Sequence, residues 1–360
     1  MKSIVIEGPA RVSGVITPGG NKNAALPIIA AAILTRDEVV IHNMPVILDV
    51  EVMLDLARDL GASVRREGST VVICARDIDS ASLPPKKCAA LRASFIFGGA
   101  VAARCGESFI GLPGGDFIGR RRLDSHFYGL EKLGIGKTFD QDTAVVHFQV
   151  GKNGLSGADI FLDEASVTAT EHILMTAAAA RGTTLIRNAA SEPHVRQLGE
   201  MLNAMGAEIT GLDSNTITVK GGELHGAEVT VEGDHIEAAS YIALAACTRS
   251  PITITGILRP RDYWMTRRVF EKLGVRFKLH PDLIEVSGGQ RMKVQPDFGH
   301  AIPQISDGPW PQFPSDMMSC MIVCAKGHSI IHNADTIFRG YANICEKLSG
   351  LGVEVTLEEH

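Results

Sequence analysis

Residues 50–62 read VEVMLDLARDLGA, an amphipathic stretch that closes on a leucine, a glycine and a small apolar residue. Its apolar side chains recur at helical spacing, and a glycine directly after the last of them is typical of a helix C-terminus. Similar endings occur five times in the chain, roughly 70 residues apart. Their glycines are Gly61, Gly134, Gly206, Gly274 and Gly352. This periodicity predicts a chain built from repeated units.

Two further patterns recur with this ending. An alanine-rich apolar helix leads into a short strand-like run most clearly at 177–188, with related copies at 35–43 and 325–333. Alternating strands open several units, as at 11–17 and 224–231. We therefore predict a unit of strand, alanine-rich helix, strand, amphipathic helix and paired strands. The alanine-rich helix should be buried, because it is apolar on nearly all sides, and the amphipathic helix should face solvent.

Five such units account for almost all of the 360 residues and predict an α/β fold. Glycine-containing breaks near 20–22 and 221–227 divide the chain into two domains with a cleft between them. The first domain should span 22–225 and hold three units. The second should combine 1–21 with 226–360.

Composition narrows the class of protein. A hydrophobic content of 45% is ordinary for a soluble protein with a sizeable core, and a net charge of −6 argues against a general nucleic-acid binder. The longest apolar run near the N-terminus, 24–34, is too short to cross a bilayer, and no signal-peptide pattern opens the sequence. Seven scattered cysteines, an odd number, are typical of reduced thiols and predict a cytoplasmic protein.

Residues 112–126, LPGGDFIGRRRLDSH, carry the densest set of chemically informative side chains. Asp116 lies among glycines that permit sharp turns, and three arginines follow at 120–122. Guanidinium groups bind phosphate and carboxylate through paired hydrogen bonds, so the loop suits a polyanionic small molecule. A solvated basic turn is the competing explanation for the arginines. For Asp316, near the other end of the chain, the competing role is stabilisation of a helix N-terminus.

Six motifs taken together resemble the enolpyruvyl transferase family. They are GNKNAALP at 20–27, LRAS at 91–94, the loop at 112–126, ASVTA at 165–169, GDHIE at 233–237 and GPWPQFPSD at 308–316. Each motif is weak alone, but their order and spacing span essentially the whole chain. The resemblance implies an inside-out, barrel-like α/β fold with two domains of three β-α-β-α-β-β units each, and a catalytic lid at 112–122.

The resemblance also implies a reaction. The 3-hydroxyl of UDP-N-acetylglucosamine adds to C2 of phosphoenolpyruvate, and phosphate is then released to give a peptidoglycan precursor, with no metal or redox cofactor. The implied catalytic residues are Asp116, Asp316 and Lys22. The implied phosphoenolpyruvate contacts are Lys22, Asn23, Arg92, Arg121 and Arg339. The implied UDP-sugar contacts are Arg92, Arg121, Arg122, Leu123, Asp124, Ser125, Glu164, Ala165, Ser166, Val167, Asp316 and Ile337.

Two substitutions depart from the family pattern. Asp116 stands where most members carry a cysteine, although some natural members carry aspartate there. Fosfomycin alkylates that cysteine, and a carboxylate is a far poorer nucleophile, so we expect a fosfomycin-resistant enzyme. His235 stands where many members have an arginine, which is expected to alter contacts between the domains.

The second domain is one unit short, since five of the usual six are detectable. Either the chain joins the front of unit five to the back of unit six, or it is cut after unit five. Exposed apolar surface or an unpaired sheet edge should follow, which favours a homo-oligomer. Two other hypotheses stay open: a non-catalytic relative that binds a UDP-sugar, and an enolpyruvyl transferase with another nucleotide acceptor.

Overall fold

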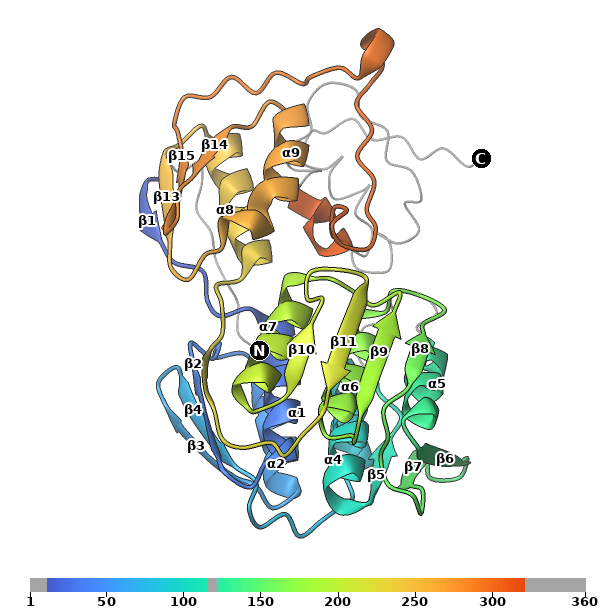
Figure 1. Ribbon diagram of the computed structural model, residues 1–360. Coiled ribbons are helices and arrows are strands. Elements are labelled where there is room, and N and C mark those ends of the chain that lie inside the picture. The colour runs from blue at the N-terminus through green and yellow to red at the C-terminus, as the bar shows by residue number, and fades with distance from the viewer. Residues whose placement is uncertain (1–11, 115–121, 321–360) are drawn as a thin grey trace.

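The computed structural model describes residues 12–114 and 122–320. These form two bodies joined by two connecting segments (Figure 1). Each body has its own hydrophobic cluster, one built from residues between Ala24 and Val231 and the other from residues between Ala238 and Cys320. The predicted α/β class is confirmed. No helix in the described part of the chain is long and apolar enough to cross a membrane.

The first body contains three units, each with a sheet and two longer α-helices; the second unit has a short additional helix, α3. The first unit comprises α1 (Lys22–Ala31), η1 (Ala32–Leu34), β2 (Glu38–His42), α2 (Leu48–Asp59), β3 (Ser63–Glu67) and β4 (Thr70–Cys74). The second comprises α3 (Pro85–Cys88), η2 (Arg92–Ile96), α4 (Phe97–Cys105), β5 (Glu107–Gly111), α5 (Asp124–Lys132), β6 (Ile135–Asp140) and β7 (Val145–Val150). The third comprises β8 (Asp159–Phe161), α6 (Val167–Ala178), β9 (Thr183–Arg187), α7 (Pro193–Ala204), β10 (Glu208–Thr210) and β11 (Thr216–Lys220).

The second body repeats this plan once in full among the described residues. It contains β1 (Gly14–Ile16), α8 (His235–Thr248), β13 (Ile252–Thr255), η3 (Pro260–Tyr263), α9 (Trp264–Lys272), β14 (Phe277–Leu279) and β15 (Leu283–Val286). The chain then runs through η4 (Phe298–His300) to η5 (Ser315–Met317).

The sheets lie outside and the alanine-rich helices inside. Figure 1 shows α1, α4 and α6 enclosed by the strands of the first body. Residues 24–31 of α1 are all buried, as the apolar sequence predicts. The glycines that end the amphipathic helices have left-handed backbone angles, with φ of 97° at Gly61, 98° at Gly134, 111° at Gly206 and 76° at Gly274. This conformation is the one that a glycine after a helix permits, so four of the five predicted helix ends are confirmed. Gly352 lies outside the described residues.

The two bodies exchange strands. β1 precedes α1 in the sequence but pairs in parallel with β13 of the second body. A further strand, β12 (Glu228–Thr230), precedes α8 but pairs in parallel with β2 of the first body. The resulting sheet orders are β1-β13-β15-β14 and β12-β2-β4-β3, while the other two are β10-β11-β9-β8 and β5-β7-β6. The chain therefore crosses between the bodies just after β1 and just after β12.

The two crossings lie side by side and are hydrogen bonded. Gly20 and Gly233 form an isolated antiparallel bridge. The Asn21 backbone N–H donates to Glu232 O at 2.8 Å, and the Asp234 N–H donates to Gly19 O at 2.8 Å. These bonds fix the two connections to each other, so they act as one joint.

One expectation about the helices is wrong for α7. It was expected to face solvent, but residues 193–199 are all buried. The reason is that the start of α7 packs against the second body as well as against its own. Exposed apolar side chains occur on both bodies, for example Phe161 on the first and Trp264 on the second, so in the described residues they are not confined to the second body.

Candidate functional site

A cavity of about 520 Å³ lies between the two bodies. Its walls come from the starts of α1, α6 and α7 in the first body, and from the start of α8 and the 308–316 segment in the second. The lining residues are Asn23, Leu26, Pro27, Ala93, Ala165, Val167, Thr168, Glu171, Glu192, His194, His235, Ile236, Gly308, Pro309, Trp310, Pro314, Ser315 and Asp316. A cavity of this size between domains is a usual setting for a small-molecule ligand.

The start of α1 contributes Asn23 to this cavity. Asn21 caps the helix by accepting a hydrogen bond from the Ala24 N–H at 2.9 Å, and its side-chain amide donates to Asp234 Oδ1 at 3.3 Å across the joint. Lys22 is not part of the cavity wall in this conformation. Its ammonium group is ion paired with Asp49 Oδ2 at 3.3 Å.

Two of the predicted arginines, Arg92 and Arg122, lie beside the start of α5. The Arg92 guanidinium donates to Arg122 O at 3.2 Å, and Arg122 Nε donates to Asp124 Oδ2 at 2.9 Å. The pKa of Arg122 is raised, first by the hydrogen bond to Asp124 and further by the nearby charge of Glu164. Arg92, Arg122, Asp124 and Glu164 therefore form one electrostatic group. Leu123 precedes α5 at its N-cap position.

The start of α6 carries the remaining predicted contacts. Ser166 caps this helix by accepting a hydrogen bond from the Ala169 N–H at 3.4 Å, while Ala165 and Val167 line the cavity. Ser125 differs from its neighbours in the predicted set because it is buried. Its place in the first turn of α5 directs it into the protein, away from solvent.

Asp316 lies on the opposite wall, in η5 of the second body. It is exposed to the cavity and shares that wall with His235, at the start of α8. The structure thus brings Asn23, Ala165, Val167 and Asp316 to one cavity from three separate segments. The other predicted residues, Asp116, Arg121, Ile337 and Arg339, lie outside the described residues.

Comparisons with known proteins identify the family. The profile of the EPSP synthase (3-phosphoshikimate 1-carboxyvinyltransferase) family matches residues 6–360. The chain belongs to this family. Among similar proteins, UDP-N-acetylglucosamine 1-carboxyvinyltransferase of Borreliella burgdorferi is 42% identical over 361 residues, covering 99% of this chain and 83% of the relative. The enzyme of that name from Bradyrhizobium diazoefficiens is 44% identical over 358 residues, covering 98% of this chain and 81% of the relative.

Solved structures of the EPSP synthase family support the fold. The enolpyruvyl transferase NikO from Streptomyces tendae has a TM-score of 0.69 at 23% identity, over 78% of this chain and 67% of that one. EPSP synthase from Acinetobacter baumannii has a TM-score of 0.62 at 18% identity, over 78% of this chain and 66% of that one. The inside-out architecture expected from the sequence is therefore the architecture of this family.

A buried chain of hydrogen bonds in this family member runs behind the cavity. The Gly99 N–H donates to His172 Nε2 at 2.6 Å, so that nitrogen carries no proton. His172 must then donate from Nδ1 to His126 Nδ1, 3.0 Å away, which leaves His126 Nε2 to donate to Thr168 Oγ1 at 3.2 Å. Burial lowers the pKa of His172 to about 3 and that of His126 well below its usual range, so both rings are neutral. His126 is therefore a packed residue that orients the cavity-lining Thr168.

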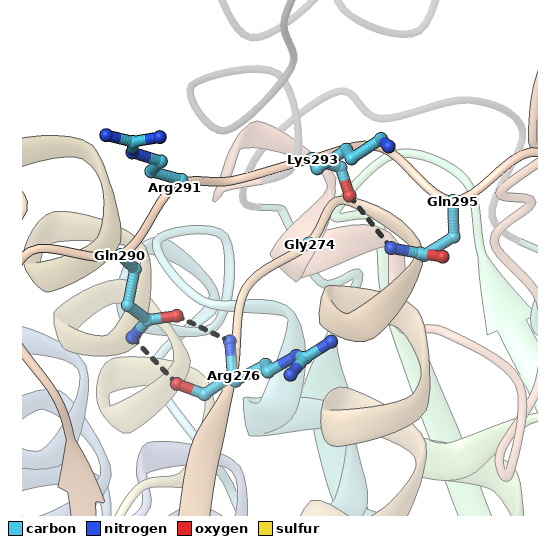
Figure 2. Close-up of a pocket in the computed structure, with 6 residues that line it drawn as sticks. All are labelled: Gly274, Arg276, Gln290, Arg291, Lys293 and Gln295. Atoms are coloured by element: carbon cyan, nitrogen blue, oxygen red, sulfur yellow. Dashed lines mark hydrogen bonds between the residues drawn. The ribbon is translucent and has the colours of Figure 1, made fainter.

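A second hollow of about 270 Å³ lies on the second body, next to Gly274 (Figure 2). Three cations line it, but Figure 2 shows the guanidinium groups of Arg276 and Arg291 pointing away from each other. The Gln290 side chain accepts a hydrogen bond from the Arg276 N–H and donates one to the Arg276 carbonyl, at 2.8 Å each. This hollow is a packing feature around the helix end, with no convergent set of groups for an anion.

Sequence reasoning missed the polar residues of the first-body wall. Glu171, Glu192 and His194 all line the cavity, and none was predicted as a site residue. For Glu171 a signal existed, because a lone carboxylate in the apolar run of α6 is unexpected in a buried helix. Glu192 and His194 gave no such signal, since charged residues before a helix are common on the surface.

Proposed function

We propose that this chain transfers the enolpyruvyl group of phosphoenolpyruvate to the 3-hydroxyl of UDP-N-acetylglucosamine. The observation that carries the proposal is the shared cavity. Asn23 and the start of α6 face Asp316 across it, and each comes from a motif of the enolpyruvyl transferase pattern. The similarity to proteins named UDP-N-acetylglucosamine 1-carboxyvinyltransferase supports this acceptor over shikimate 3-phosphate.

The reaction has two steps with opposite proton movements. In the first, Asp316 accepts the proton of the sugar hydroxyl while the hydroxyl oxygen forms a bond to C2 of phosphoenolpyruvate. Asp116 supplies a proton to C3. In the second, the bond between C2 and the phosphate oxygen breaks, phosphate leaves, and a C3 proton passes to the Asp116 carboxylate, which restores the double bond. Cationic groups from Lys22, Arg92 and Arg121 stabilise the phosphate as it departs.

The proposed function includes a division into two domains. We propose that 22–225 acts as the first domain, with its lid at 112–122, and that 1–21 with 226–360 acts as the second. The two hydrophobic clusters support this division. In this division, β12 belongs to the second domain by sequence but pairs with β2 in a sheet of the first.

Phosphate release from phosphoenolpyruvate, measured with and without UDP-N-acetylglucosamine, tests the function. Release should depend on the sugar nucleotide and fall by about 10²–10⁴-fold in Asp316→Asn, as expected for loss of a general base. Asp282→Asn is the matched control, because Asp282 is exposed between β14 and β15 of the same body. It should keep full activity.

Three outcomes separate the competing hypotheses. Binding of UDP-N-acetylglucosamine with no phosphate release would indicate a non-catalytic relative. Release with UMP or another nucleotide, but not with the UDP-sugar, would indicate a different acceptor. Unchanged release in Asp316→Asn would contradict the role of this carboxylate.

A further inference from the structure

Three polar atoms of the cavity wall are buried and have no hydrogen-bond partner among the described residues. They are Glu171 Oε1, Glu192 Oε2 and His194 Nδ1. Buried polar atoms in native proteins are nearly always paired, and each exception calls for an explanation. Three exceptions around one cavity point to a polar occupant.

The local structure directs these side chains into the cavity. Glu171 lies one turn after Val167 and Thr168 on α6, so helical spacing puts all three on the cavity-facing side. Glu171 itself is only 2% exposed.

Glu192 and His194 approach from α7. Glu192 occupies the N-cap position but does not cap the helix with its side chain. Its Oε1 instead accepts a hydrogen bond from the Trp310 N–H at 3.4 Å, and Ser191 Oγ donates to Trp310 O at 3.2 Å. These bonds hold the first-body wall against the 308–316 segment. His194, 6% exposed, lies in the first turn of α7.

Burial favours the uncharged forms of these three groups. Burial, with the nearby charge of Glu192, raises the pKa of Glu171 well above its usual range. Burial also raises the pKa of Glu192. For His194, burial, together with the charges of His235 and Arg196, lowers the pKa to about 3. In its uncharged form, a carboxyl or an imidazole can both donate and accept a hydrogen bond, which suits hydroxyl and amide groups better than a phosphate.

We propose that Glu171, Glu192 and His194 form a hydrogen-bonding subsite for the neutral, hydroxyl- and amide-bearing sugar ring of the nucleotide sugar. The inference rests on the proposed function and deepens it, by assigning the sugar to this wall. The charged part of the same ligand belongs beside Arg92 and Arg122, which supply the cations. Three new positioning and specificity residues are thereby assigned.

Titration calorimetry with two ligands tests the subsite. UDP-N-acetylglucosamine reports on the whole ligand, and UDP reports on the part without the sugar. In Glu171→Leu, the dissociation constant for UDP-N-acetylglucosamine should rise about tenfold, as for a lost buried hydrogen bond, while that for UDP stays unchanged. The free protein should melt at a higher temperature, because a buried unpaired carboxyl is replaced by an apolar side chain. A purely structural residue would not combine higher stability with weaker sugar binding.

A second variant and a control complete the design. Glu192→Gln keeps the length of the side chain and should weaken sugar-nucleotide binding by about threefold without affecting UDP. Glu131→Leu, on the exposed side of α5, should change neither dissociation constant.

The outcomes distinguish the inference from the proposed function. If the wild type releases phosphate but Glu171→Leu and Glu192→Gln both bind the UDP-sugar normally, the subsite is overturned and the function stands. If the wild type binds UDP and the UDP-sugar equally well, no sugar subsite exists, whatever the reaction. If the wild type neither binds the UDP-sugar nor releases phosphate, the function fails and the inference fails with it.

Discussion

Arg196 provides the most demanding test of how the two bodies are held together. It lies on α7 and is 2% exposed. Its guanidinium donates to both oxygens of Asp262 in η3, at 2.9 and 3.0 Å, and to Glu232 Oε2 at 2.5 Å. Desolvation lowers the pKa of this guanidinium, but the bonds to Asp262 and the charge of Glu232 outweigh it, so the net direction is upward. The pair thus joins α7 of the first body to η3 of the second.

Replacing Arg196 by methionine should destabilise the protein by about 3–5 kcal/mol, the range found when one partner of a buried ion pair is removed. The effect comes mainly from Asp262, whose side chain is 8% exposed and would lose its bidentate partner. Glu232 would keep its ion pair with Arg259. Asp213, 36% exposed, is too well solvated to add more than about 0.5 kcal/mol.

Equilibrium urea unfolding followed by circular dichroism measures this loss. Arg268→Met is the matched control: Arg268 is 73% exposed and lies 3.9 Å from Glu271, so its loss should change the unfolding free energy by less than about 0.5 kcal/mol. The double variant Arg196→Met with Asp262→Leu should recover part of the loss, because it removes the unpaired carboxylate. Equal stability of Arg196→Met and Arg268→Met would refute the reasoning.

Three further predictions concern separate parts of the molecule. Gly61→Ala should destabilise by at least about 1 kcal/mol, because φ is 97° and the new Cβ would lie 2.8 Å from Asp77 O; Gly68→Ala, at φ 59° in open space, should have a smaller effect in the same urea assay. His172→Gln should reduce the loss of unfolding free energy at acid pH. Burial lowers the pKa of His172 to about 3 in the folded protein, whereas unfolded histidine has a pKa near 6.5. The stabilisation is therefore complete above pH 6.5 and falls by up to about 1.4 kcal/mol per pH unit as the pH drops from 6.5 towards 3. Equal slopes in urea unfolding at pH 7.5, 6 and 5 would argue against a buried neutral ring. Fosfomycin should leave the wild type active without a mass adduct, whereas Asp116→Cys should gain time-dependent inactivation with one adduct; an adduct on the wild type would contradict this.

Local sequence signals predicted the units well. The helix-ending glycines are informative because a positive φ is a property of one residue and needs no distant partner. The burial of α1 follows equally directly from an apolar run that leaves no polar face. In both cases the determining physics acts within a few residues, so the sequence alone contains it.

Pairing between distant segments was harder to predict from the sequence. The strand at 224–231 was visible as an alternating pattern, but its pattern does not say whether it joins the sheet before it or the sheet after it. β12 pairs with β2, which lies nearly the length of the first body earlier in the chain. The ion pair between Lys22 and Asp49 was equally hard to predict, because it depends on how α1 and α2 pack against each other.

Glu192, His194 and Arg196 show why the site was only partly predictable. All three lie within five residues at the start of α7, and their sequence is that of an ordinary solvated helix end. Contact with the second body gives them different surroundings. Two nitrogens of Arg196 donate to carboxylates, whereas Glu192 and His194 each line the cavity with a buried atom that has no partner in the described structure. A buried hydrogen-bond network whose groups are paired holds the packed elements in one arrangement. Buried polar atoms without a partner are expected at functional sites, where stability was not the deciding requirement. The same turn of helix therefore joins the two bodies through Arg196 and places Glu192 and His194, the residues that we propose bind the sugar, at the wall of the cavity.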